Sequence, residues 1–270
     1  MTKKNRLDVH LLTKGLVESR EQAQKLIRAG KVRDCFGKIL DKPGLDVPKD
    51  ISLKVQFAPK FVSRGGEKLD AALVQFPIKT LDRVCIDAGI STGGFTDCLL
   101  KRGASLVYGI DVGYGQIAWS LRNDSRVVLK ERTNIRNLKA DELYGDLAPK
   151  ASLAVADLSF ISLRLVLPAI KALLDERNKE ALLLIKPQFE VGRERVGKGG
   201  VVREVNAHID ALNTIIEFSK LEGWKVQGIM PSPLKGPAGN HEYLLWLKME
   251  GVNQTTNLAK LVKNTLCLES

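Results

Sequence analysis

A glycine-rich turn stands where a buried strand should give way to a helix. The stretch Asp87-Ala-Gly-Ile-Ser-Thr-Gly-Gly-Phe95 follows the apolar run that begins at Arg83. Glycines at such a point let the backbone bend sharply and approach a ligand closely. Asp111 ends the next apolar run, 24 residues after Asp87. An acidic residue there commonly binds ribose hydroxyls, so the pattern predicts a ligand that contains a nucleoside.

The spacing of the turn narrows the choice of ligand. The order Asp-x-Gly-x-x-x-Gly-Gly differs from the GxGxxG turn of dinucleotide-binding proteins, and no phosphate-loop lysine follows. By itself a glycine turn is equally compatible with tight packing that binds nothing. The expected ligand contacts are Asp87, Gly89, Ser91, Thr92, Gly93, Gly94, Phe95 and Asp111.

Four charged residues stand close to the ends of apolar segments. Asp157 and Lys186 each end a strand, and Glu242 begins the last strand. Lys68 lies near the start of a helix that precedes the first strand. Because a charged group is rarely buried without a partner or a function, two interpretations are open. The four form a catalytic cluster, or they form structural ion pairs such as Lys186 with Glu242.

Alternating strands and helices would position these residues. The expected strands are Arg83–Asp87, Leu106–Asp111, Val127–Glu131, Leu153–Asp157, Ala181–Lys186, Lys225–Met230 and Tyr243–Lys248, and the expected helices are 95–102, 114–122, 139–143, 162–177 and 204–222. This alternation predicts an α/β fold with a mostly parallel sheet. The loop 231–241 is too short for a helix, so the last two strands should form an antiparallel hairpin. Such a seven-stranded sheet resembles the Rossmann-like fold of S-adenosylmethionine-dependent methyltransferases, which favours S-adenosylmethionine over NAD or a nucleoside triphosphate.

Several longer motifs point to one family. They are SRGGEKL, DAGISTGGFTD, ADLSFISL, IKPQFE, GKGGVVRE and NHEYL. With these motifs the chain resembles the TlyA (hemolysin A) family, whose catalytic domain is FtsJ-like, over nearly all but its last twenty or so residues. The resemblance implies methylation of the ribose 2′-hydroxyl of cytidine in ribosomal RNA. It also implies that Lys68, Asp157, Lys186 and Glu242 form the Lys-Asp-Lys-Glu tetrad of these enzymes, and it adds Asn134 to the cofactor contacts.

The implied methyl transfer needs few catalytic groups. The methyl group of S-adenosylmethionine is already activated, so the protein must align a hydroxyl and take up its proton, and no metal is expected. Lys186 is expected to contact that hydroxyl, either to steer it or as a base. A base would have to be neutral, which burial and Lys68 promote and the carboxylates oppose. Asp157 and Glu242 would hold the two lysines in place.

Alternative functions predict sequence features of their own, which can be looked for in this chain. Methylation of a base carbon needs a nucleophilic cysteine, typically after proline, and none of the four cysteines follows a proline. Exocyclic-amine enzymes carry a Pro-Pro-aromatic turn where this chain has Leu-Ser-Phe. A non-catalytic RNA-binding or assembly factor is a second alternative, and the retained tetrad argues against it. For a membrane-lytic hemolysin, the sequence lacks a spanning or strongly amphipathic segment.

The amino-terminal quarter is strongly basic. Residues 1–64 hold 15 Lys and Arg against 7 Asp and Glu, a net charge of +8 out of +11 for the whole chain. A short helix is expected over 6–16, and a second opens at a capping box formed by Ser19 and Gln22. This part resembles, over residues 6–56, the RNA-binding domain named after ribosomal protein S-four. Expected RNA contacts are Arg6, Arg20, Lys25, Arg28 and Lys31 here, and Arg64, Arg195 and Lys198 beyond it.

These observations predict an RNA-binding domain over 1–58, a linker over 59–64, a methyltransferase domain over 65–250 and a tail over 251–270. The linker reads Pro59-Lys-Phe-Val62 where mycobacterial members have Arg-x-Trp-Val, so its role in ligand binding is open. The loop 191–204 is expected to move and to close on RNA, although an ordinary surface loop fits almost as well. Without a signal sequence, a zinc-type cysteine pair or a membrane span, the sequence predicts a cytoplasmic protein that works on ribosomal subunits.

Overall fold

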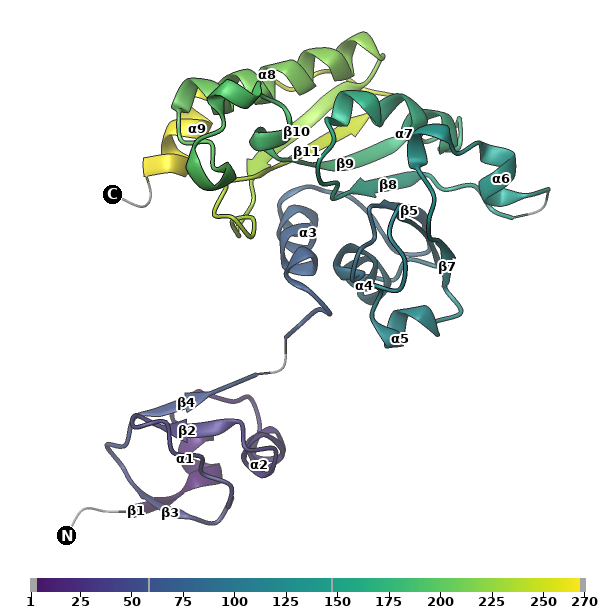
Figure 1. Ribbon diagram of the computed structural model, residues 1–270. Coiled ribbons are helices and arrows are strands. Elements are labelled where there is room, and N and C mark those ends of the chain that lie inside the picture. Colours follow the sequence, from purple (N-terminus) through teal and green to yellow (C-terminus); the bar gives the residue numbers. More distant parts are fainter. Residues whose placement is uncertain (1–3, 58, 147, 268–270) are drawn as a thin grey trace. The chain divides into compact units, whose positions relative to one another are not determined.

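The computed structural model describes residues 4–57, 59–146 and 148–267. They form two compact units, one ending at Pro59 and the other beginning at Lys60 (Figure 1). Residues 1–3, 58, 147 and 268–270, which include the outer ends of the expected RNA-binding domain and tail, lie outside the described residues. Each unit has a hydrophobic core of its own.

The small unit combines two helices with two short antiparallel sheets. Its elements are β1 (Lys4–Arg6), α1 (Leu7–Thr13), α2 (Arg20–Arg28), β2 (Val32–Asp34), β3 (Asp46–Pro48) and β4 (Leu53–Val55), with β1 paired to β3 and β2 to β4. The expected cap of α2 is present, since the Ser19 hydroxyl accepts from the Gln22 amide. The Gln22 side chain, however, accepts from the amide of Glu18 rather than of Ser19.

The large unit is built on a seven-stranded sheet. Its strands are β5 (Val84–Ala88), β6 (Leu106–Ile110), β7 (Val127–Lys130), β8 (Leu153–Ala156), β9 (Glu180–Ile185), β10 (Lys225–Pro231) and β11 (Tyr243–Lys248). Their order is β10-β11-β9-β8-β5-β6-β7, and β11 runs antiparallel to both of its neighbours. The expected fold, including the terminal hairpin, is therefore confirmed.

Helices cover both faces of this sheet. They are α3 (Arg64–Gln75), α4 (Gly94–Lys101), α5 (Trp119–Arg122), α6 (Ala140–Tyr144), α7 (Leu167–Leu173), α8 (Val205–Leu221) and α9 (Leu258–Cys267). The helix expected over 114–122 is wrong in its first half, because Gly115 has a φ of +74° that a right-handed helix cannot contain. The helix expected over 162–177 is divided at Val166 into a 3₁₀ turn, Leu163–Leu165, and α7.

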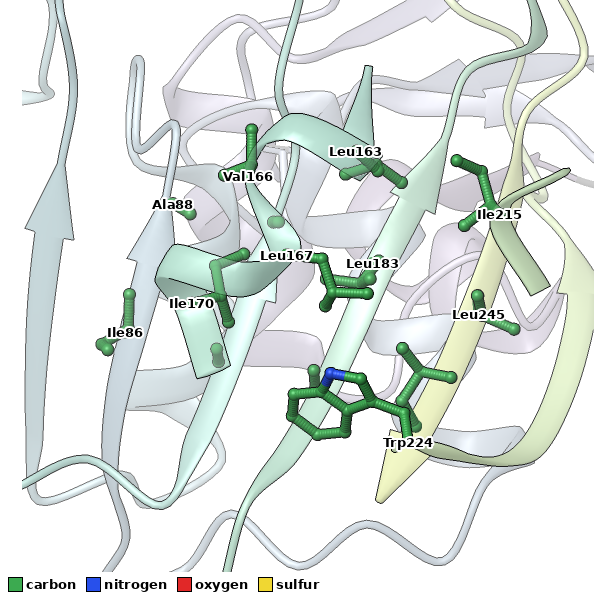
Figure 2. Packing of buried hydrophobic residues seen from close by; sticks show 14 of the residues in the cluster. Ile86, Ala88, Leu163, Val166, Leu167, Ile170, Leu183, Ile215, Trp224 and Leu245 are labelled. Atoms are coloured by element: carbon green, nitrogen blue, oxygen red, sulfur yellow. The ribbon is translucent and has the colours of Figure 1, made fainter. Parts of the chain in front are cut away.

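Both faces of the sheet carry apolar cores. Alternate residues of a strand point to opposite faces, so Ile86 joins one core and Cys85 the other. Figure 2 shows the first core, in which Ile170 of α7 lies on the side of Ile86, and Ile215 of α8 lies near the strand that carries Leu245. This burial on both faces explains why the strands read as continuous apolar runs.

The carboxyl-terminal segment is part of the large unit. Residues 251–270 are expected to be a tail and carry no functional signal in the sequence. Within their described part, α9 packs against α8, and the fully buried Val262 belongs to the first core.

Candidate functional site

The four charged residues singled out in the sequence lie together at the carboxyl end of the central strands. Lys186 follows β9 and Asp157 follows β8, and 2.7 Å separates Nζ from Oδ1. Lys68, in the first turns of α3, lies 2.5 Å from Oε2 of Glu242, which immediately precedes β11. The structure therefore pairs each lysine with one carboxylate. The alternative pair of Lys186 with Glu242 is not formed.

The pair of Lys68 and Glu242 is buried, which is unusual for charged side chains. Both side chains are nearly inaccessible, at 7% exposed for Lys68 and 0% for Glu242. Burial raises the pKa of Glu242, and the nearby ammonium groups of Lys68 and Lys186 oppose that rise. The second oxygen of Glu242, Oε1, is buried without a hydrogen-bond partner and lies against Gly236, where a Cβ would come within 2.4 Å of it.

Lys186 stands at the edge of an open groove. Its Nζ also donates to the hydroxyl of Ser159 at 3.0 Å, a contact that the sequence analysis missed. An ammonium has three protons, of which Ser159 accepts one, while the Asp157 carboxylate faces the ammonium as an ion pair. The groove, with a volume of about 460 Å³, is lined by Ser63, Arg64, Gly65, Lys68, Ser91, Asp157, Ser159, Lys186, Lys235 and Pro237. The ammonium of Lys186 thus keeps donor capacity for a group that enters this groove.

A second cavity, of about 420 Å³, lies beside the glycine turn. The turn needs glycine at two points. Gly89 has a φ of +83°, and a Cβ there would come within 2.8 Å of the Asp157 carbonyl oxygen. Gly93 has a φ of +94°, and a Cβ would meet the Leu121 side chain at 2.3 Å. The glycines therefore let the turn fit between its neighbours and leave the cavity open above it.

Asp111 lines this cavity and is hydrogen-bonded to the glycine turn. Its Oδ2 accepts from the amide of Ser91 at 2.8 Å, and its Oδ1 accepts from the amide of Gly113 at 2.7 Å. Each carboxylate oxygen can accept more than one hydrogen bond, so Asp111 keeps capacity for hydroxyl groups. Apolar side chains that include Ile110, Ile135 and Val166 line the same cavity. An acidic acceptor beside an apolar slot suits a nucleoside, and the volume is that of a small-molecule site.

Most of the expected cofactor contacts lie at this place. Gly89, Ser91, Asp111 and Asn134 line the larger cavity, and Thr92, Gly94 and Phe95 line a smaller one of about 80 Å³ beside it. Sequence reasoning missed Gln116, Thr133 and Phe160 among the lining residues. Phe160 could have been noticed as an aromatic residue in a polar turn; its side chain is 91% exposed and its φ is +64°.

Asp87 and Gly93 line neither cavity, so direct contact of either residue with the ligand stays a prediction. Asp87 is fully buried, and its Oδ2 accepts from the amide and the hydroxyl of Thr96, at 2.9 and 2.7 Å. Burial raises the pKa of Asp87 to about 7. Its carboxyl group therefore fixes the start of α4 from below the turn.

The expected linker is firmly attached to the large unit. The Phe61 ring is 4% exposed, and the amide of Val62 donates to Asp97 of α4 at 2.9 Å. Lys101 donates to the carbonyl of Lys60, and the ammonium groups of both lysines lie about 5 Å from the Phe61 ring, at 5.1 and 5.2 Å. Residues 60–62 thus contact the helix that begins at the glycine turn.

Two of the RNA contacts expected in the small unit, Arg6 and Arg20, are held by one buried acidic residue. Asp8 is completely buried and accepts from Arg6, from Arg20 at 2.9 Å and from Gln24 at 3.0 Å. The hydrogen bond from Arg6 holds the pKa of the Asp8 carboxyl far below its usual range. Both arginine side chains are still about half exposed, at 50% and 51%.

The remaining expected RNA contacts are more scattered. Lys25, Arg28 and Lys198 are exposed, and Lys31 is half-buried. Arg64 donates to the carbonyl of Lys235 at 2.7 Å and lines the groove beside Lys186. Arg195 is paired with Asp210 at 2.6 Å.

The loop 191–204 is fastened at its carboxyl-terminal end. The buried Asn240 side chain accepts from the Val202 amide at 2.9 Å and donates to the Gly200 carbonyl at 2.8 Å. His208 contacts the Val202 carbonyl at 3.0 Å. Movement of the loop onto RNA stays a prediction, and any such movement would have to leave this end in place.

Two further properties concern only the described part of the chain. Over residues 4–57, 59–146 and 148–267, no three His, Cys, Asp or Glu side chains are grouped as metal ligands would be. No helix within those ranges has the length and apolar character to cross a membrane.

Comparisons with known proteins match both parts of the chain. The FtsJ-like methyltransferase family matches residues 61–249, and the S4 domain matches residues 5–33. The chain is 48% identical to the YqxC protein of Bacillus subtilis, over 94% of this chain and 89% of that one. It is 46% identical to the 16S/23S rRNA (cytidine-2′-O)-methyltransferase TlyA of Mycobacterium tuberculosis, over 93% and 92%. A solved structure from Streptococcus thermophilus that carries a hemolysin name is 40% identical, with a TM-score of 0.72 over 98% of this chain and 96% of that one.

Proposed function

Because this chain belongs to the FtsJ-like methyltransferase family and carries an S4 domain before it, we propose that it transfers a methyl group from S-adenosylmethionine to the ribose 2′-hydroxyl of cytidine in ribosomal RNA. The observation that carries the proposal is the pairing of Lys186 with Asp157, and of Lys68 with Glu242, at one edge of the sheet. The cavity beside Asp111 and the groove beside Lys186 share Ser91, Asp157 and Ser159 in their linings. A cofactor in the first and a substrate in the second would therefore meet at Asp157.

The residues around Asp111 are suited to hold the cofactor. Asp111 would accept from the ribose hydroxyls, and Asn134 and the apolar walls would enclose the base. Bound there, S-adenosylmethionine supplies a methyl group on a positively charged sulfur. The protein's task is then to place an acceptor oxygen in line with that methyl group and to exclude competing orientations.

Lys186 has the geometry for that task. Its ammonium group lies against Asp157 and donates to Ser159, and because Lys186 lines the groove it would also donate to an acceptor oxygen bound there. Lys68, held by Glu242, lines the same groove and would bind the hydroxyl or a neighbouring phosphate. Holding Lys68 by the buried Glu242 and Lys186 by the partly exposed Asp157 would prepare the site before the substrate arrives, which reduces the reorganisation needed in the transition state.

RNA capture would fall largely to the small unit, whose basic residues contact phosphates with little base specificity. Arg64 beside the groove would add a contact near the reacting nucleotide. Such an enzyme would work in the cytoplasm, where ribosomal subunits are found.

The test is methyl transfer by the purified full chain. Ribosomal subunits from a strain that lacks the gene should accept labelled methyl groups, and ribose-methylation mapping should locate them on a cytidine 2′-oxygen. Label on a base would contradict the proposal. Tight binding of subunits without transfer by the wild-type chain would support the alternative of a non-catalytic assembly factor.

A further inference from the structure

Phe36 occupies an unusual position in the small unit. It lies at the tip of a hairpin in which Arg33 pairs with Ile39, and its side chain is 93% exposed. Within the described residues this is the highest exposure of any large hydrophobic side chain. Leaving a phenyl ring in water forgoes roughly 1.5–3 kcal/mol that burial would contribute. Folding of the unit therefore gives no reason for a phenylalanine here.

The turn that presents Phe36 is well fixed. Oδ1 of Asp34 accepts from the amides of Phe36 and Lys38, both at 2.9 Å. The Asp34 amide donates to the Lys38 carbonyl at 3.0 Å, and Gly37 takes a φ of +84° that closes the turn. A ring on such a turn is already in place for a partner, so binding would cost little additional backbone entropy.

The charges around the ring indicate the partner. Arg33 and Lys38 flank the turn and are exposed, and Arg33 donates to the Gly37 carbonyl at 3.0 Å, which holds its guanidinium beside the tip. An aromatic ring between two cations suits a polyanion that also offers flat aromatic faces. Single-stranded RNA has both properties, since phosphates attract the cations and unpaired bases stack on aromatic side chains.

We propose that Phe36 stacks on an unpaired base of the RNA substrate, with Arg33 and Lys38 on the neighbouring phosphates. The proposal rests on the proposed function and makes it more specific. Bases inside an A-form helix are covered on both faces by their neighbours, so this contact selects an unpaired segment of the RNA. The small unit would then distinguish unpaired from double-helical RNA, in addition to binding phosphates.

Filter binding of ribosomal RNA to the full chain, measured over a series of salt concentrations, tests this inference. Four variants are compared with wild type: F36A, F36L, F36W and, as the matched control, F57A, since Phe57 is also exposed in the small unit, at 52%, and lies outside the hairpin that presents Phe36. F36A and F36L should bind about tenfold more weakly, since stacking on one base contributes on that order. F36W should bind like wild type, and F57A should change affinity little.

The salt series separates stacking from charge. Because a phenyl ring releases no counterions, F36A should keep the wild-type dependence of affinity on salt, whereas Lys38→Ala should reduce that slope by about one. The F36W variant should also show more fluorescence quenching on adding single-stranded RNA than wild type, whose own tryptophans are Trp119, Trp224 and Trp246. Unchanged RNA affinity of F36A, a loss shared equally by F57A, or an F36L variant that binds normally would overturn the proposal. Failure of wild type to bind any ribosomal RNA would instead refute the proposed function.

Discussion

Lys186 and Asp157 face each other at the ends of two adjacent parallel strands, with 2.7 Å between Nζ and Oδ1. The lysine side chain is 10% exposed and the aspartate side chain 24%, so the pair lies at the boundary between the core and the groove. Parallel strands bring residues that lie 29 positions apart in the sequence to the same edge of the sheet.

Replacing Lys186 with alanine should therefore affect turnover and leave binding intact. Loss of a group that positions or deprotonates the acceptor typically lowers the rate by about 10²- to 10⁴-fold. S-adenosylmethionine affinity, measured by calorimetry, should stay within about twofold, since this residue does not line the cofactor cavity. Lys79→Ala, at an exposed lysine of the same unit, is the control. Near-normal methyl transfer by Lys186→Ala would show that the pair is only structural.

Asp111 should be required for cofactor affinity. Asp111→Ala removes the acceptor of two backbone hydrogen bonds and of the expected ribose contact, so affinity for S-adenosylmethionine should fall by about 10- to 100-fold. Asp111→Asn keeps one acceptor oxygen and should lose less. Calorimetry on both variants, with circular dichroism to verify the fold, measures this. Preferential binding of NADH or ATP by the wild-type chain would contradict the assignment of the cavity.

Charge reversal in the small unit should weaken RNA binding without destabilising the fold only at residues that form no ion pair with Asp8. Lys25→Glu with Arg28→Glu changes two exposed residues of α2, and the salt dependence of rRNA affinity should fall by about one unit of slope per lost phosphate contact. Arg20→Glu would instead place a second carboxylate against the buried Asp8 and should destabilise the unit itself. Binding assays and thermal melts of both variants, side by side, distinguish these outcomes. Unchanged rRNA affinity of the α2 variant would move the capture surface elsewhere, for example to the loop 191–204.

The sequence was sufficient for the order of elements and for the edge of the sheet at which the four charged residues gather. Apolar runs, the glycine turn and the short final loop predict the sheet, because each depends on neighbouring residues in the chain. The partners of the charged residues could not be predicted this way. Lys68 and Glu242 are 174 positions apart in the sequence. Only the folded sheet decides that Glu242 pairs with Lys68 and not with Lys186.

Side-chain geometry explains the other differences. Arg20, Gln24 and Arg28 follow one another at intervals of four along α2, but the buried Asp8 of another helix binds the first two and not the third. The sequence of α1 shows an aspartate and no sign that it will be enclosed. Likewise, a linker with proline and lysine reads as exposed, whereas Phe61 is buried because Gly66 leaves space for its ring.

That last contact gives a prediction about stability. A Cβ on Gly66 would lie 2.3 Å from Cγ of Phe61, so Gly66→Ala should destabilise the large unit although alanine favours a helix by about 1 kcal/mol over glycine. Phe61→Ala should cost about 3–5 kcal/mol by leaving a cavity. In the double variant the methyl group added at position 66 occupies space that the Phe61 ring has left. The two losses in free energy of unfolding should therefore not add. Denaturation in urea measures all three, and simple additivity would rule out this packing.

Asp87 predicts a dependence of stability on pH with a definite sign. Burial raises the pKa of Asp87 to about 7 in the folded chain, against about 3.9 in the unfolded chain. Between these values the folded state keeps a proton that the unfolded state has lost. The free energy of unfolding should therefore fall as pH rises through this window, by at most about 1.4 kcal/mol per unit, and level off above it.

Asp87→Asn is the variant that isolates this effect. Its amide oxygen can accept both Thr96 hydrogen bonds, and the side chain does not titrate. Burial also raises the pKa of Glu242 and of Glu190, but both groups are present in each protein and cancel in the difference. Urea denaturation at several values between about pH 5 and pH 8 should show the variant gaining stability relative to wild type as pH rises to about 7. Parallel curves for the two proteins would mean that Asp87 is already ionised in the folded chain, held by a partner for its buried Oδ1.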